Sequence, residues 1–212
     1  METLVLTEPG RFTLTETALP APPGPGEALV RVHRVGVCGT DLHAFKGEQP
    51  FFSYPRILGH ELGVEVIALG GGAADTGLAV GDRCAVEPYL HCGACIVCRQ
   101  GKTNCCVRLQ VLGVHTDGGM RELITVPADK LRRSSTLSYE QLALVEMLGI
   151  GAHAVGRAAI VPGEFALVIG AGPIGLSTLA FAQQAGAQVI ALDLAPGRLD
   201  FARQALGVGH TV

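Results

Sequence analysis

Residues 165–193 read FALVIGAGPIGLSTLAFAQQAGAQVIALD, and this stretch decides the fold of the second part of the chain. Its pattern predicts a strand over 165–170, a helix over 173–185 and a second strand over 188–193, with another helix over 197–206. Alternation of strands and helices is typical of α/β domains built on a parallel sheet.

The same stretch carries no charged residue from Phe165 to Leu192, and by length it could span a bilayer. Four glycines, a proline and three glutamines interrupt the run, however, and a buried strand–turn–helix–strand unit explains them better. We therefore expect no membrane association.

The turn between the first strand and the first helix matches the dinucleotide-binding pattern G-x-G-x-x-G in its required context. Gly170 would allow the tight turn, Gly172 the approach of a pyrophosphate, and Gly175 close packing of helix on strand. A glycine-rich turn without a ligand is the alternative. The predicted cofactor-binding residues are Gly170, Gly172, Pro173, Ile174, Gly175, Asp193 and Arg198.

The last two residues of that set bear on which dinucleotide binds. Asp193 ends the second strand, where its carboxylate can accept hydrogen bonds from ribose hydroxyls and would repel a 2′-phosphate. NAD is therefore favoured over NADP. Arg198 tempers this preference, because a nearby arginine can accommodate the 2′-phosphate.

Earlier in the chain, the runs Cys38-Gly-Thr-Asp-Leu-His43 and Gly59-His60-Glu61 offer a thiol, an imidazole and a carboxylate. Cys38, His60 and Glu61 are the ligand types of a zinc ion that keeps one position open, and such an ion is a Lewis acid toward an alcohol. Neighbouring side chains on a strand point to opposite faces. Both His60 and Glu61 can therefore be ligands only if the backbone turns at Gly59; otherwise Glu61 acts on the ion indirectly.

Three further residues are candidates for the same site. Glu146 is expected on a helix that begins with the capping box Ser138–Gln141, and it is a candidate fourth or exchanging ligand. Thr40 and His43 could relay a proton from the substrate to solvent. Alternatively, Thr40 simply caps the following turn.

Residues 91–106 contain a second cysteine pattern. Cys92, Cys95, Cys98 and Cys106 are spaced as the ligands of a closed, structural zinc site, and the segment is too poor in apolar residues to order itself without metal. Cys105 is the rival fourth ligand. Disulfides are the less favoured alternative for a chain of seven cysteines with no secretory signal. Cys84 and the unused member of the adjacent pair are then ordinary thiols.

The first 130 residues contain many short strands separated by turns, which indicates a small barrel or sandwich. A change of phase near Arg34 predicts a β-bulge just before Cys38. The spacing of apolar residues changes from a strand pattern to a helical pattern after Ser138, so a domain boundary is expected near 145–160. The expected strands cover 3–7, 12–17, 28–37, 62–69, 84–87 and 120–126.

Composition excludes several classes of function. The chain has 212 residues, of which 48% are hydrophobic and 17% charged, so it can bury a core. Its net charge is −3 and its basic residues are scattered, which argues against nucleic-acid or anionic-membrane partners. The N-terminus carries no secretory signal, so a cytoplasmic protein is expected.

Taken together, the open zinc site, the four-cysteine site and the glycine fingerprint resemble the zinc-dependent medium-chain dehydrogenase/reductase family over nearly the whole chain. The resemblance implies a GroES-like β-barrel catalytic domain, 1–150, followed by an incomplete Rossmann domain, 151–212. It implies Cys38, His60 and Glu61 at a catalytic zinc, with Thr40 and His43 in a proton relay. In the polyol, sugar-acid and threonine dehydrogenase branches of this family a glutamate occupies the place of Glu146, and the chain resembles these branches in this respect.

The expected function is therefore transfer of a hydride from a secondary alcohol of a polyol, sugar acid or hydroxy amino acid to NAD, with two zinc ions per chain. A dimer or tetramer is expected for the full-length form. Family members are considerably longer than this chain, so a C-terminally truncated, inactive zinc-binding fragment is one alternative. A zinc-independent enone or quinone reductase of the same superfamily is another.

Overall fold

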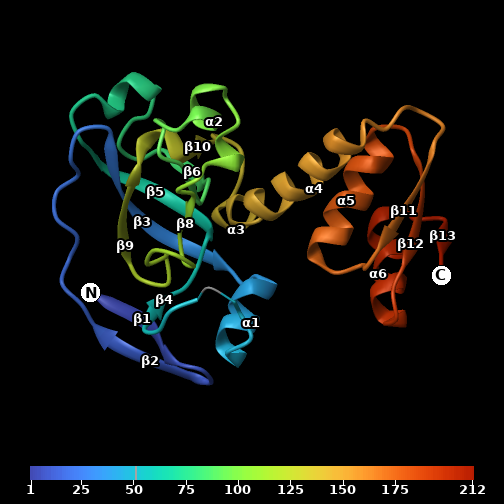
Figure 1. The fold of residues 1–212 in the computed structure, drawn as a ribbon, viewed down its shortest axis with the longest axis horizontal. Coiled ribbons are helices and arrows are strands. Elements are labelled where there is room, and N and C mark those ends of the chain that lie inside the picture. Colours follow the sequence, from blue (N-terminus) through green and yellow to red (C-terminus); the bar gives the residue numbers. More distant parts are fainter. Residues whose placement is uncertain (51) are drawn as a thin grey trace. The chain divides into compact units, whose positions relative to one another are not determined.

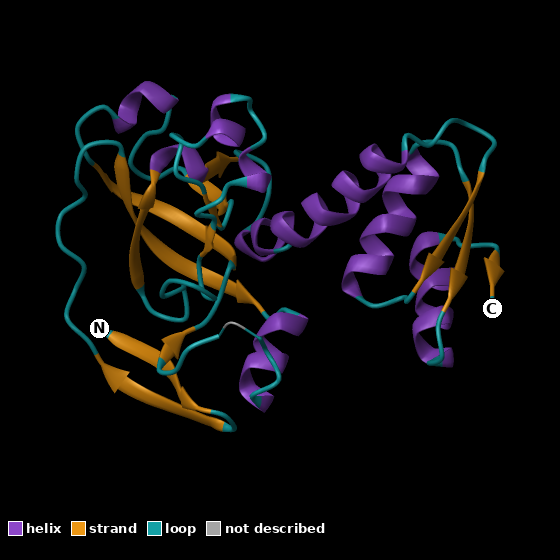
Figure 2. Ribbon diagram, viewed as in Figure 1, coloured by secondary structure: helices purple, strands orange, loops and turns teal. Residues whose placement is uncertain are grey.

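The structure, a computed structural model, describes residues 1–50 and 52–212. The chain divides into two compact units, Met1–Glu146 and Met147–Val212. Strands dominate the first unit, whereas helices and strands alternate in the second (Figures 1 and 2). No helix within the described ranges is long and apolar enough to cross a membrane.

The first unit is built on antiparallel strands. A five-stranded sheet has the order β10-β6-β5-β3-β9, a three-stranded sheet the order β2-β1-β4, and β7 pairs with β8. The strands are β1 (Glu2–Glu8), β2 (Arg11–Glu16), β3 (Glu27–Gly36), β4 (Arg56–Ile57), β5 (Glu61–Leu69), β6 (Arg83–Val86), β7 (Tyr89–Leu90), β8 (Gln110–Val111), β9 (Leu123–Pro127) and β10 (Leu131–Arg133).

The core of this unit lies against the five-stranded sheet. Val30 of β3, Val64 and Val66 of β5, and Ile124 of β9 are completely buried, as their alternation with polar residues along each strand requires. The pairing of β3 with β5 shifts register between Val32 and Arg34, which confirms the predicted bulge. After the bulge the strand leads directly into Cys38.

Short helices join these strands: α1 (Gly39–Lys46), α2 (Ile96–Arg99) and α3 (Tyr139–Ala143), with 3-10 turns at Ala73–Thr76, Thr103–Cys105 and Ala128–Lys130. The predicted capping box at Ser138 is confirmed at the start of α3. This helix does not reach Glu146, however. At Leu144 the backbone N–H bonds to the carbonyl of Gln141, a tightened final turn, and Glu146 belongs to the next helix, α4 (Val145–Ala158).

The second unit has the predicted α/β pattern. Strands β11 (Phe165–Ile169), β12 (Gln188–Leu192) and β13 (His210–Thr211) form a parallel sheet, connected by α5 (Pro173–Gln184) and α6 (Pro196–Leu206). Its core contains Leu179 and Ala191, both completely buried. Helices α4 and α5 approach closely, since a Cβ at Gly151 would stand 2.1 Å from the Ser177 hydroxyl.

Candidate metal and dinucleotide sites

The structure brings Cys38, His60 and Glu61 together, with one ligand atom of each within 4.8 Å of the others. Cys38 is the N-cap residue of α1, His60 precedes β5, and Glu61 is the first residue of that strand. His60 and Glu61 are each only 6% exposed. Three potential metal ligands therefore meet at a largely buried point where β3 ends and β5 begins.

The backbone turn that the adjacent pair requires is present. Gly59 has a φ of +95°, a conformation that glycine adopts readily, and the chain enters β5 immediately afterwards. Opposite Glu61 in the ladder lies Gly36, where a Cβ would stand 2.2 Å from the Glu61 Oε2 atom. The missing side chain at Gly36 thus makes the space that the carboxylate occupies.

Asp41, which the sequence analysis did not assign, supports this cluster. It is 4% exposed, its Oδ2 accepts a 2.9 Å hydrogen bond from the Cys38 backbone N–H, and its Oδ1 lies 3.9 Å from the Nδ1 of His60. Neither Oδ1 nor Nδ1 has another partner among the described residues. Orientation of a histidine by a carboxylate is usual at metal centres, and it leaves Nε2 for the metal.

The electrostatics of the cluster suit a cation. The contact with His60 lowers the pKa of the Cys38 thiol. Burial raises the pKa of Glu61, and of Asp41 too. At His60, burial favours the neutral ring, but contact with Cys38 and the charge of Asp41 raise the pKa overall. A thiolate and two carboxylates crowd one imidazole, so a bound divalent ion would compensate their charge. The donor set therefore fits zinc.

The remaining predicted residues of this site lie around the cluster rather than in it. The Cys38 thiol donates to the Thr40 hydroxyl at 3.7 Å. His43 is exposed on α1. Glu146 stays outside the group of mutually close ligand atoms, and its Oε1 accepts a 2.7 Å hydrogen bond from the Tyr89 hydroxyl.

Cys92, Cys95, Cys98 and Cys106 form the second cluster, again with ligand atoms within 4.8 Å of one another. The Sγ atoms of Cys95 and Cys98 are 3.3 Å apart, and all seven cysteines of the chain are free thiols. Cys105 is exposed and is not part of the group, so the geometry favours Cys106 as the fourth ligand.

Local backbone groups prepare this cluster for metal. Backbone N–H groups of Ala94 and Cys95 lower the pKa of Cys92 to about 5, whereas burial raises that of Cys98 to about 12. One thiol is therefore ionised without metal and another requires a cation nearby to ionise. By contrast, Cys84 is a core thiol whose pKa is raised by burial to about 11.

The glycine turn of the second unit has the geometry that its pattern predicts. Gly170 has a φ of +96°, and a Cβ at Gly175 would stand 1.7 Å from the carbonyl oxygen of Gly170. A Cβ at Gly172 would meet no atom within 4 Å. Pro173 begins α5 at this point, and Ile174 beside it is 40% exposed. The N-terminus of α5 is thus open to an approaching phosphate.

Asp193 is bound into this turn. Its Oδ2 accepts a hydrogen bond from the Ala171 N–H and its Oδ1 one from the Ala195 N–H, each 2.7 Å long. These two donors lower the pKa of the Asp193 carboxyl. The guanidinium of Arg198 lies 3.5 Å away and is 60% exposed. The carboxylate is therefore ionised and fixed at the end of β12, with an exposed cation beside it.

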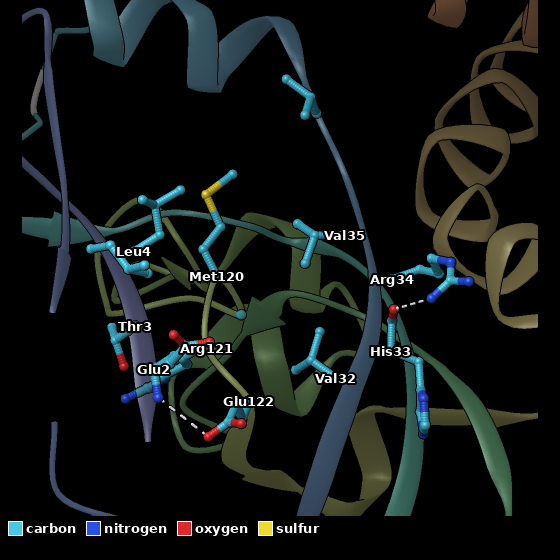
Figure 3. Close-up of a pocket in the computed structure, with 13 residues that line it drawn as sticks. Glu2, Thr3, Leu4, Val32, His33, Arg34, Val35, Met120, Arg121 and Glu122 are labelled. Atoms are coloured by element: carbon cyan, nitrogen blue, oxygen red, sulfur yellow. Dashed lines mark hydrogen bonds between the residues drawn. The ribbon is translucent and has the colours of Figure 1, made fainter. Parts of the chain in front are cut away.

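A separate groove lies on the first unit, between β1, β3 and the segment before β9 (Figure 3). Leu4, Val32, Val35 and Met120 give it an apolar lining, and the Glu2 N–H donates to Glu122 at its edge. The groove contains none of the predicted metal ligands, so it is distinct from both clusters.

Comparison with known proteins adds independent findings. The family model for the alcohol dehydrogenase GroES-like domain matches residues 24–135. L-galactonate-5-dehydrogenase of Escherichia coli is 46% identical over 198 residues, which cover 93% of this chain and 57% of that protein. The chain thus spans little more than half the length of this relative. These matches and the observed sheets confirm the predicted fold class, a GroES-like barrel followed by the start of a Rossmann domain.

Two solved structures resemble the chain closely. One is a short chain alcohol dehydrogenase (rspB) from Escherichia coli complexed with NADH, with a TM-score of 0.92 and 33% identity over 100% of this chain and 62% of that chain. The other is a putative zinc-binding dehydrogenase from Sinorhizobium meliloti bound to NADP, with a TM-score of 0.88 and 34% identity over 100% and 61%. Similar folds therefore bind either dinucleotide.

Proposed function

The chain belongs to the zinc-dependent medium-chain dehydrogenase/reductase family, and from this premise we propose that its protein transfers a hydride from a secondary alcohol to NAD. The substrate class we propose is a polyol, a sugar acid or a hydroxy amino acid. The presence of Glu146 and the similarity to a sugar-acid dehydrogenase support this choice.

The observation that carries the proposal is the buried group Cys38, His60 and Glu61. Zinc held there would act as a Lewis acid that lowers the pKa of a substrate hydroxyl. Cys38 contributes a thiol whose pKa is already lowered, and Oδ1 of Asp41 lies 3.9 Å from Nδ1 of His60, where a carboxylate can orient the ring. The four-cysteine group would hold a second zinc that organises its own loop.

A proton leaves the substrate hydroxyl in this reaction, and Thr40 and His43 are the proposed path. Thr40 lies against the Cys38 thiol, and His43 is exposed on the same helix, where it can exchange a proton with solvent. We expect Thr40→Ala to slow alcohol oxidation while zinc content stays unchanged. An unaltered rate would exclude the relay.

For the cofactor we propose NAD bound at Gly170–Gly175 with its ribose hydroxyls near Asp193. The ionised, fixed carboxylate would repel a 2′-phosphate. Arg198 is the residue that would accommodate NADP instead. Titration with NADH and NADPH, followed by nicotinamide fluorescence, decides between them. We further propose that the protein is cytoplasmic. Its full-length form is proposed to assemble as a dimer or tetramer, and analytical ultracentrifugation would measure that assembly.

The central experiment measures zinc content and NADH production with a panel of sugar acids, polyols and hydroxy amino acids. We expect two zinc ions per chain and turnover that Cys38→Ser abolishes, with one zinc retained. Turnover without zinc would indicate a zinc-independent reductase. A folded, two-zinc chain that turns over no alcohol would indicate a zinc-binding role instead.

A further inference from the structure

One contact beside the Cys38 cluster has no part in the function proposed above. The Tyr89 hydroxyl donates a 2.7 Å hydrogen bond to Oε1 of Glu146. The two residues are 57 positions apart in sequence, and both are partly buried. Burial and the neighbouring carboxylate raise the pKa of Tyr89, so the phenol keeps its proton and remains a donor.

Tyr89 is held firmly in this position. It is the first residue of β7 and pairs with Val111 of β8. It directly follows Pro88, whose side chain is completely buried. The backbone of Tyr89 is thus anchored in a strand pair, and its hydroxyl holds one oxygen of Glu146 by the 2.7 Å hydrogen bond.

Glu146 is close enough to the cluster for its charge to act on His60 and on Glu61. Even so, its carboxylate is not within the 4.8 Å group that Cys38, His60 and Glu61 form. Its position is therefore that of a nearby carboxylate held back from the ligands, rather than that of a fourth member of the group.

We propose that Tyr89 is a positioning residue that holds Glu146 off the metal, so that the fourth position stays open for the substrate oxygen. This inference rests on the proposed function, because it concerns the zinc of the Cys38 cluster. The oxygen of Glu146 that accepts the phenol hydrogen bond has less electron density to donate to a metal, and leaving the phenol costs Glu146 that bond. Tyr89 thus sets how often Glu146 competes with substrate.

The test uses Tyr89→Phe, which removes only the hydroxyl. Zinc is loaded, and its release from the Cys38 cluster to a chelator is timed; the zinc that Cys38→Ser lacks identifies this site. Loss of a hydrogen bond to a charged group corresponds to about a tenfold change in an equilibrium. We therefore expect Tyr89→Phe to release this zinc about tenfold more slowly, because Glu146 now adds a ligand.

Cobalt(II) supplies a second readout that a merely structural role would not move. Glu146 in the fourth position would replace a water ligand of cobalt by a carboxylate, so the visible d–d bands of cobalt in the Cys38 cluster should shift in Tyr89→Phe. In a Glu146→Gln background the same substitution should change neither the spectrum nor the release rate by more than twofold.

Tyr139→Phe is the matched control. Its ring stacks on His33, and its hydroxyl makes no hydrogen bond within the described residues, so neither readout should change. Unchanged or faster zinc release in Tyr89→Phe, or an equal effect without the Glu146 carboxylate, would overturn the positioning role alone. Absence of metal from the Cys38 cluster in the unaltered chain would overturn the proposed function and this inference together.

Discussion

Replacement of Gly36 by alanine tests the geometry of the Cys38 cluster most directly. The new Cβ would stand 2.2 Å from Oε2 and 2.8 Å from Cβ of Glu61. Rotation of the carboxylate relieves the first contact, but the second involves an atom fixed to the backbone of β5, so the two strands must separate locally. Overpacking of this kind costs about 1–3 kcal/mol of folding stability.

The effect on metal should exceed the effect on folding. Glu61 can relieve the clash only by turning its carboxylate away from Cys38 and His60. Because displacement of supporting groups at metal sites lowers affinity about 10–100-fold, we expect a loss of this size for the zinc of the Cys38 cluster. Competition against a chromophoric chelator measures it, and urea unfolding of the metal-free chain measures stability.

Gly39→Ala provides the control for that substitution. A Cβ at Gly39 would meet no atom within 4 Å, and the residue begins α1, where alanine is favourable. Zinc affinity and stability should stay as they are in the unaltered chain. If the zinc affinity of the Cys38 cluster in Gly36→Ala were within twofold of that in the unaltered chain, the space at Gly36 would not be needed to hold the Glu61 carboxylate.

Three further predictions test other parts of the molecule. Glu87→Gln leaves the 5%-exposed ammonium of Lys130, now 2.7 Å from the carboxylate, without a countercharge, and should cost about 2–4 kcal/mol in urea unfolding. Burial raises the pKa of Glu87, but Lys130 and Arg132 together outweigh it and lower the pKa overall. This stability is therefore present at neutral pH and lost as the pH falls through the lowered pKa, and the stability of Glu87→Gln should not show that loss at acidic pH. Cys106→Ser should remove one zinc per chain by atomic absorption, whereas Cys105→Ser should remove none, and equal losses would contradict the assignment. Gly175→Ala places a Cβ 1.7 Å from the carbonyl oxygen of the first fingerprint glycine, so NADH binding by fluorescence should disappear; retained binding would exclude the close packing.

Much of the fold could be predicted because its determinants are local. The βαβ unit follows from apolar runs and from glycines whose positions along the chain dictate the turn, as Gly170 and Gly175 illustrate. The bulge in β3 was visible as a change of phase. The break between α3 and α4 was not, because Leu142 and Leu148 keep helical spacing across Leu144, where only the backbone tightens.

The parts of the candidate sites that escaped prediction depend on contacts between distant segments. Asp41 stands three residues after Cys38, which marks a capping position, but its second role appears only when His60 lies 3.9 Å away. Tyr89 has no sequence signal that links it to Glu146. The adjacent thiols of Cys105 and Cys106 differ in burial, since Cys105 is exposed and Cys106 is buried. The spacing of cysteines along the sequence does not predict which of the two is buried.

The position of the Cys38 cluster in the sheet has a dynamic consequence. Gly36 and Glu61 form the final rung of the β3–β5 ladder, and Cys38 follows two residues later. Ends of ladders fray at a small fraction of the free energy of global unfolding. A metal there would link the two strands at the open end of the ladder, so amide exchange at this pair would slow with metal occupancy. Glu61 is therefore part both of the metal cluster and of the end of the sheet that opens first.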